Sequence, residues 1–315
     1  LKLLGRAHSS DPQSTSPLNE LALSNMVQGN LDNAGSLLRQ SLELNENDAT
    51  ALTNLGALLQ HRGHILSAIA CYQKLLSNSP DDIEVRCNLA KAQADAGQTD
   101  AALDSCDAAI SLAESHPYTL ATKGAVLTDF EHYSDAETLL EQACNAMPDD
   151  DMSLVNLALC QDALGDTQAA AQSLEQALHA NKLNARAIAD LANCWIKLDE
   201  IQSALNLCEG FLEFHPHECL VIASYALALS AANATERAHE LTNFDNLIKV
   251  YNIGSDQHNI QHINTALALQ IKNDPSLLND PVSKSTSGGA QTGELDLSFS
   301  SEFKSLNMHF AQSVR

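Results

Sequence analysis

The sequence is poor in aromatic and in basic residues. Only 4 % of its 315 residues are Phe, Trp or Tyr, which argues against a sheet sandwich, whose strands favour aromatic and β-branched side chains. It has 17 Lys and Arg against 40 Asp and Glu, so the net charge is −23 at pH 7. A surface this acidic repels phosphate backbones and anionic lipid heads. Nucleic acids and membrane surfaces are therefore poor candidates as partners.

The sequence also has no C-x-x-C pair among its eight cysteines and no apolar run long enough to span a bilayer. The cysteines fall within apolar stretches of helical character. We expect them to be small core residues in a reducing, cytoplasmic compartment rather than disulfides or zinc ligands. Abundant Ala and Leu favour a structure of many closely packed helices.

A period of 34 residues runs through most of the sequence. One column of this repeat holds only alanine, and a second column, twelve residues earlier, holds only alanine or glycine. The two columns are Ala34, Ala68, Ala102, Ala136, Ala170, Ala204 and Ala238, and Ala22, Gly56, Ala90, Gly124, Ala158, Ala192 and Ala226. Small residues on two paired helices let the helices approach closely where they cross. A fixed period near 34 residues is typical of stacked helix-turn-helix units.

Three more columns mark the core and the ends of the helices. A leucine precedes the small residue of the first helix, a glycine recurs in the turn within a unit, where a positive φ angle is often needed, and a proline recurs where a unit ends. They are Leu21, Leu55, Leu89, Leu157 and Leu191; Gly29, Gly63, Gly97 and Gly165; and Pro80, Pro148 and Pro216. Lys123 and Tyr225 replace the leucine in two units.

These columns resemble the tetratricopeptide repeat. The resemblance covers residues 1–243 and implies an all-α, right-handed superhelical solenoid, with units that start at residues 15, 49, 83, 117, 151, 185 and 219. Residues 1–14 look like the tail of a preceding, truncated unit. The family's aromatic position is kept at Tyr72 but is otherwise filled by Cys106, Leu140, Leu174 and Cys208. The resemblance further implies that the solenoid binds a protein or peptide.

Short polar residues precede the leucine column, at a position that faces the concave side in long tetratricopeptide superhelices. They are Asn54, Asn88, Thr122, Asn156 and Asp190, with Glu20 in the first unit. A row of amides there can form paired hydrogen bonds with the backbone of an extended peptide, whatever its sequence. The alternative is that these residues make only local contacts, and both interpretations stay open. On so acidic a surface we expect an extended, basic ligand.

A second resemblance begins where the repeat fades. Residues 243–250 (NFDNLIKV), 275–277 (PSL) and 284–295 (KSTSGGAQTGEL) resemble the start of a 2-oxoglutarate- and iron(II)-dependent oxygenase domain that follows tetratricopeptide repeats in bacterial proteins. The match departs from the family at Asp274, where His is common. It implies that residues 244–315 are the incomplete N-terminal part of an α+β oxygenase-like domain. Fe(II) and 2-oxoglutarate would then be cofactors of a longer parent protein.

The ligand pattern of such an oxygenase does not occur in this chain. The family binds iron through an H-x-D/E motif and a distant His, and none of the twelve histidines is followed two residues later by Asp or Glu. We therefore expect no catalytic residue, no metal ligand and no cofactor within these 315 residues. Locally, the pattern predicts a β-prone run at 247–251, helices near 256–272 and 301–314, and a loop over 279–293.

Two other candidates have plainer explanations. His215, His217 and Glu218 could suggest a metal site, but they fall at the turn between two repeats, where such a cluster is usually solvated. Trp195 falls on a first helix, so we expect it to pack in the core or between repeats rather than to stack on a ligand.

Three functions stay open. The main hypothesis is the substrate-recruiting part of a larger oxygenase, and the alternative is an interaction or assembly scaffold with no enzymatic role. A glycosyltransferase-type protein with a long tetratricopeptide array is a third possibility, against which the segment at 288–293 (GGAQTG) speaks.

Overall fold

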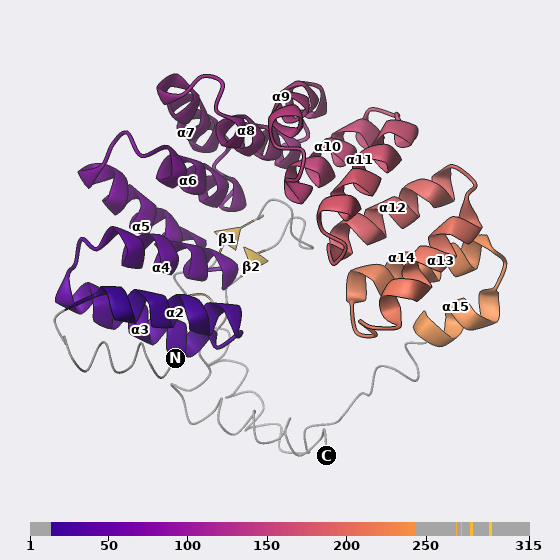
Figure 1. Cartoon of the computed structure of the whole chain (residues 1–315), viewed down its shortest axis with the longest axis horizontal. Helices are drawn as coiled ribbons and strands as arrows, with labels where there is room; N and C mark the ends of the chain where they lie inside the picture. The colour runs from indigo at the N-terminus through magenta and orange to yellow at the C-terminus, as the bar shows by residue number, and fades with distance from the viewer. Residues whose placement is uncertain (1–13, 243–268, 270–271, 273–277, 280–289, 292–315) are drawn as a thin grey trace, which may run out of the picture. The chain divides into compact units, whose positions relative to one another are not determined.

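The computed structural model describes residues 14–242, together with Leu269, Lys272 and the residue pairs 278–279 and 290–291. Residues 14–242 form fourteen helices in consecutive helix-turn-helix pairs (Figure 1). The helices are α2 (Ser16–Val27), α3 (Leu31–Leu44), α4 (Ala49–His61), α5 (Ile65–Asn78), α6 (Ile83–Asp95), α7 (Thr99–Leu112), α8 (Pro117–Asp129), α9 (Tyr133–Ala146), α10 (Asp151–Ala163), α11 (Thr167–Ala180), α12 (Ala185–Lys197), α13 (Ile201–Leu212), α14 (Cys219–Ala231) and α15 (Thr235–Thr242).

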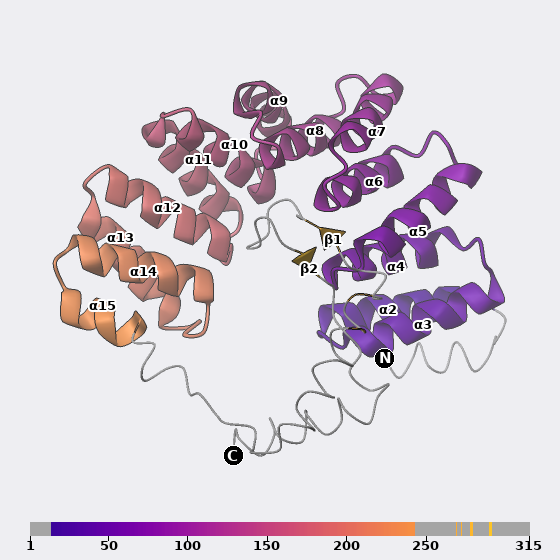
Figure 2. The ribbon, with the colours of Figure 1, turned by 180° about the vertical axis from the view of Figure 1, so that it is seen from behind.

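The helices belong to two compact units, with the boundary between Ala113 and Glu114. The first unit contains α2 to α7 and the second contains α8 to α15. Within each unit, the first helix of a pair contacts the first helix of the next pair, and each second helix contacts the first helix that follows it. The first helices of a unit therefore line up side by side in one layer, as Figure 2 also shows. Each unit is a helix-pair solenoid with one continuous surface made by its first helices.

The two predicted columns of small residues are buried throughout. All seven alanines of the second-helix column and all seven small residues of the first-helix column are buried. At two positions only glycine fits. A Cβ on Gly56 would lie 2.7 Å from Tyr72 Cε1, and a Cβ on Gly124 would lie 2.6 Å from Leu140 Cγ. The prediction that these columns mark close helix crossings is confirmed.

The turn within each helix pair needs a positive φ angle, as the glycine column predicts. Gly29, Gly63, Gly97 and Gly165 have φ angles between 72° and 96°. The same position of the 34-residue period in the remaining units is taken by Glu131 (φ 64°), Asp199 (φ 63°) and Asn233 (φ 59°). The left-handed turn is therefore a property of every unit, with or without glycine.

Acidic and amide side chains at the start of first helices tie neighbouring repeats together. The Asp48 carboxylate accepts the backbone N–H of Ala51 at 2.7 Å and so caps α4, and it also accepts the Thr15 hydroxyl at 2.5 Å from the preceding repeat. In the second unit the Asn184 side chain caps α12 through the N–H of Ala187 at 3.0 Å. These caps satisfy helix-terminal N–H groups and fix where each repeat begins.

Most of the cysteines and the tryptophan lie where the sequence predicts. Six of the eight thiols are buried, and Trp195 packs against the core formed by α12 to α14. Cys71 is half-buried. The prediction of a core residue is wrong for Cys219, which is exposed. Cys219 is the first residue of α14, and the first buried residue of that helix is Val221.

The tail of a preceding unit within residues 1–14, the β-prone run at 247–251 and the helix at 301–314 lie outside the described residues, apart from residue 14. Leu269 and Lys272 are helical, within the helix predicted at 256–272. The loop predicted over 279–293 is wrong at its ends. There β1 (Leu278–Asn279) pairs with β2 (Ala290–Gln291) in an antiparallel ladder, with Leu278 opposite Gln291, so these backbone groups bond to each other.

Candidate peptide-binding surface

The residues predicted to bind peptide all lie on first helices of their units. Asn54 is on α4 and Asn88 on α6 of the first unit, while Thr122, Asn156 and Asp190 are on α8, α10 and α12 of the second. Four of the five are half-buried, but Thr122 is only 1 % exposed. The predicted row therefore has a gap at Thr122.

The members of this row differ in whether a local hydrogen bond already occupies their side chain. The Thr122 hydroxyl donates to the backbone carbonyl of Tyr118 at 2.8 Å, within its own helix. The Asp190 carboxylate accepts from Arg186 Nε at 2.5 Å. Among the described residues, Asn54 and Asn156 have no side-chain hydrogen bond. These two amides are the members of the row whose hydrogen-bonding groups are left for a ligand.

A cavity of about 390 Å³ lies in the second unit, where α10, α12 and α14 meet. Most of its lining is apolar, and α12 supplies most of its polar groups. The lining residues are Ala158, Leu159, Asp162, Leu174, Asp190, Asn193, Cys194, Ile196, Lys197 and Leu227. Asp190 is the only member of the predicted row among them.

The charged groups of the cavity are already paired. Lys197 Nζ donates to Asp162 Oδ2 at 2.6 Å, which joins α12 to α10. Asp190 pairs with Arg186 one helical turn earlier. These pairs leave the cavity close to neutral, in contrast to the chain as a whole.

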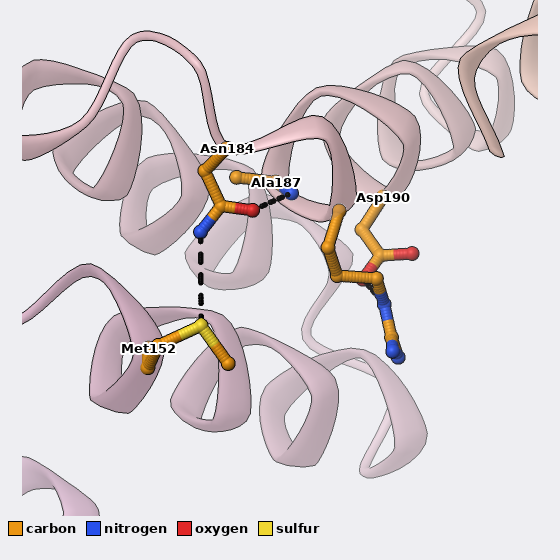
Figure 3. A network of polar contacts seen from close by, with 5 residues as sticks. Met152, Asn184, Ala187 and Asp190 are labelled. Atoms are coloured by element: carbon orange, nitrogen blue, oxygen red, sulfur yellow. Dashed lines mark hydrogen bonds and ion pairs between the residues drawn. The ribbon is translucent and has the colours of Figure 1, made fainter. Parts of the chain in front are cut away.

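The amide groups near the cavity differ in their partners. Asn193 Oδ1 is buried and has no hydrogen-bond partner among the described residues, a state that costs about 1–3 kcal/mol for a buried acceptor. Figure 3 shows Asn184 at the start of α12, where it caps Ala187 and donates to Met152 Sδ of α10 at 3.9 Å, with Asp190 further along the helix. Polar contacts thus fix α12 against α10, while one acceptor stays unsatisfied.

The cavity has no group poised for nucleophilic chemistry. Its one thiol belongs to Cys194, and burial, together with the nearby Asp162 carboxylate, raises the pKa of that thiol to about 11. A neutral thiol is a poor nucleophile. In the described part of the chain no three His, Cys, Asp or Glu side chains are grouped so as to hold a metal ion. The His215 ring instead stacks on Phe211, with ring centroids 4.6 Å apart.

Nine of the ten lining residues are not among the predicted peptide-binding residues, and three of the nine share a pattern. Leu159, Asn193 and Leu227 share one column of the 34-residue period, three residues after the row of Asn156 and Asp190. Residues three apart lie on the same face of a helix, so this column also faces the surface of the first helices. The sequence contains a signal for this column, because it holds alanine at positions 57 and 125 but a larger side chain in each of the three units from residue 151 onward.

The helices of residues 14–242 include none whose length and apolar character would allow it to cross a membrane.

Models of tetratricopeptide repeats match most of the helical part of the chain. A model described as tetratricopeptide repeat matches residues 19–83 and 53–117, and one described as Psidin, N-terminal TPR repeats region, matches residues 92–237. No curated protein shows significant similarity in sequence.

Solved structures share the fold at low sequence identity. A chain of the APC/C hetero-tetramer Cut9-Hcn1 matches with a TM-score of 0.60 and 15 % identity, over 72 % of this chain and 45 % of that one. PilW, a type IV pilus biogenesis factor, matches with a TM-score of 0.55 and 16 % identity, over 66 % of this chain and 96 % of its own. A tetratricopeptide repeat protein from Parabacteroides merdae matches with a TM-score of 0.53 and 17 % identity, over 79 % and 97 %. The chain thus spans less than half of the Cut9-Hcn1 chain it matches.

Proposed function

Because the described helices are tetratricopeptide repeats, which form a scaffold suited to protein–protein interaction, we propose that this protein binds an extended peptide on the surface of its first helices. The observation that carries this proposal is the amide of Asn54 in the first unit and that of Asn156 in the second, each half-buried on a first helix and, among the described residues, without a side-chain hydrogen bond. An amide offers one donor and one acceptor, which matches one peptide group of a ligand.

The charge of the chain indicates which peptides bind best. Residues 1–243 hold 33 of the acidic residues but only 12 of the basic ones. Opposite charge raises the association rate of a ligand, and added salt screens this attraction. We therefore expect basic peptides to be preferred and their binding to weaken as the ionic strength rises.

Replacing two amides of the row tests the proposal. Peptides selected from a random displayed library against the full chain would be titrated, by fluorescence anisotropy, into the wild type and the double variant Asn54→Ala with Asn156→Ala. Each lost pair of hydrogen bonds should weaken binding by about 1–3 kcal/mol, while the melting temperature hardly changes.

The matched control replaces two exposed amides of second helices, Gln40→Ala with Gln202→Ala. This control should bind as the wild type does. Unchanged binding in the Asn54 and Asn156 double variant would mean that these amides are structural and that the ligand docks elsewhere.

A scaffold with no enzymatic role fits the repeats at least as well as the recruiting part of an oxygenase. The resemblance to an oxygenase rests on residues 243–295, nearly all of which lie outside the described residues. The need for Fe(II) and 2-oxoglutarate in a longer parent protein therefore stays a prediction. A cytoplasmic location also stays a proposal, supported by the six buried thiols, which would be at home in a reducing compartment.

A further inference from the structure

The cavity between α10, α12 and α14 is mostly apolar and its charges are paired, whereas the chain as a whole has a net charge of −23. We propose that it holds one uncharged, apolar side chain of the bound peptide and so selects among peptides that the amide row alone would not distinguish. This inference rests on the proposed function.

Apolar side chains form two sides of the cavity and its interior. Leu159 comes from α10 and Leu227 from α14, and Leu227 is 57 % exposed. Ala158 and Leu174, which also line the cavity, are almost fully buried. A ligand side chain placed here would remove the exposed leucine surface from water, at a gain of about 25 cal/mol for each Å² buried.

The apolar surface continues along the two outer helices. Met152 and Leu220 lie seven residues before Leu159 and Leu227, which places each pair on one helix face. Both are large and about half exposed, at 55 % and 50 %. A second exposed apolar side chain thus follows the cavity on each side of α12, with Asn156 between Met152 and Leu159 on α10, and an extended peptide could follow α12 between the two helices.

The paired charges explain why the occupant is uncharged. A cationic ligand side chain would have to compete with Lys197 for Asp162, or with Arg186 for Asp190, at 2.6 Å and 2.5 Å. An anionic one would compete for the same two cations. An apolar side chain leaves both ion pairs intact, so it gains burial without breaking a contact.

The buried acceptor in the cavity wall adds a contact for the ligand backbone. Asn193 Oδ1 has no hydrogen-bond partner among the described residues. The terminal torsion of an Asn side chain is broad, so the amide can turn to accept a backbone N–H of the ligand. The volume of about 390 Å³ is at the lower end of the range of about 300–1,000 Å³ for ligand pockets. It suits one or two side chains rather than a folded element.

The test compares cavity variants with a control on peptides selected as above. In each selected peptide the apolar residue would be replaced by Ala, and affinities would be measured with the wild type, Leu227→Glu and Leu227→Trp. Leu227→Glu places a charge in the cavity, and Leu227→Trp fills it without a charge. The control is Leu66→Glu on α5, at a leucine that is 41 % exposed and lies in the first unit.

In the wild type and in Leu66→Glu, replacing the apolar residue of the peptide should weaken binding about tenfold or more, the loss expected for one buried leucine-sized side chain. In both Leu227 variants the parent peptide should bind as weakly as its Ala derivative. In Leu227→Trp this loss should persist at high salt, because it does not depend on charge.

Two results would overturn the inference while leaving the proposed function in place. One is a set of selected peptides with basic residues but no shared apolar residue. The other is an equal effect of the peptide's Ala replacement in the wild type and in both Leu227 variants. If no peptide were enriched over an unrelated control protein, the proposed function would fail as well.

Discussion

At the scale of single residues, the packing of the repeats depends on how much space faces each small residue. Gly124 lies against Leu140, and a Cβ at Gly124 would be 2.6 Å from Leu140 Cγ and 2.9 Å from its Cδ2. Leu140 is fully buried, so it has no room to move away. We predict that Gly124→Ala lowers the free energy of unfolding by about 1–3 kcal/mol, the usual cost of an overpacked core, as measured by urea denaturation.

Gly210 provides the control for this change. It lies in α13, and a Cβ added there would have no heavy atom within 4 Å. Alanine is a better helix former than glycine by about 1 kcal/mol, so Gly210→Ala should leave stability equal or raise it. A Gly124→Ala protein that unfolds at the wild-type urea concentration would show that Leu140 can be repacked.

At this scale the sequence predicts a residue's place where its type has one physical role. It does not predict burial where the neighbouring side chains determine it. The small columns could be predicted because only Ala or Gly allows the close helix crossing. Thr122 shares its column with Asn88 and Asn156, yet it is buried and its hydroxyl bonds within its own helix, whereas the two longer amides are half-buried. Exposure depended here on the size of the side chain, which the period alone does not encode.

At the scale of the helix pair, the turn is the element most constrained by backbone geometry. Glu131 occupies the turn position with a φ angle of 64°, a region that costs an ordinary L-residue about 1–2 kcal/mol. The residue type at position 131 does not predict this positive φ angle, because Glu rarely adopts one, whereas the four glycines of the column do so without steric cost. We predict that Glu131→Gly raises the free energy of unfolding by up to about 1 kcal/mol, because glycine relieves the strain but gains entropy in the unfolded chain.

The reverse change at another turn supplies the comparison. Gly97 has a φ angle of 72°, so Gly97→Ala should lower stability by about 1 kcal/mol. Urea denaturation of both variants would measure these changes. Equal stability of Glu131→Gly and the wild type, with a loss in Gly97→Ala, would mean that the Glu131 side chain makes a compensating contact.

The Glu209 carboxylate of α13 contacts side chains of both α14 and α15. The Tyr225 hydroxyl on α14 donates to Glu209 Oε1 of α13 at 2.5 Å, and Arg237 of α15 pairs with the same carboxylate at 3.1 Å. Burial, followed by the hydrogen bond to Glu209 and its charge, raises the pKa of Tyr225 to about 12 from its ordinary value of 10.0. The folded protein therefore favours the neutral phenol.

A raised pKa predicts how stability depends on pH. The contribution of neutral Tyr225 is fully present below about pH 10, the pKa of an unfolded tyrosine, and is lost as the pH rises toward about 12. We predict that the stability advantage of the wild type over Tyr225→Phe shrinks across this window. The measurement is urea denaturation of both proteins at several alkaline pH values. Other groups titrate in both proteins, so a constant difference between them would contradict the assignment.

At the scale of the whole molecule, the period predicts the helix pairs and their core but not the cavity. The cavity needs Leu159 from α10 and Leu227 from α14 on either side of Asn193 in α12, three residues that are 34 apart in sequence. The predicted peptide-binding row contains one position for each first helix, whereas the same face of a helix also presents the residue three further on. Which of these positions encloses a space depends on side chains from three repeats at once.

The reactivity of the cysteines can be used to follow the unfolding of the repeats, since the cysteines are spread from α5 to α14. Cys219 is the one exposed thiol among them, and the thiols of Cys144, Cys194 and Cys208 have pKa values raised to about 11, chiefly by burial. Only the thiolate reacts quickly with alkylating reagents. We predict that iodoacetamide modifies Cys219 first in native buffer and that the six buried thiols react only as urea unfolds the repeats. Mass spectrometry of the digested protein assigns each modified site. Native labelling of Cys208 as fast as that of Cys219 would mean that the repeat around α13 opens without denaturant.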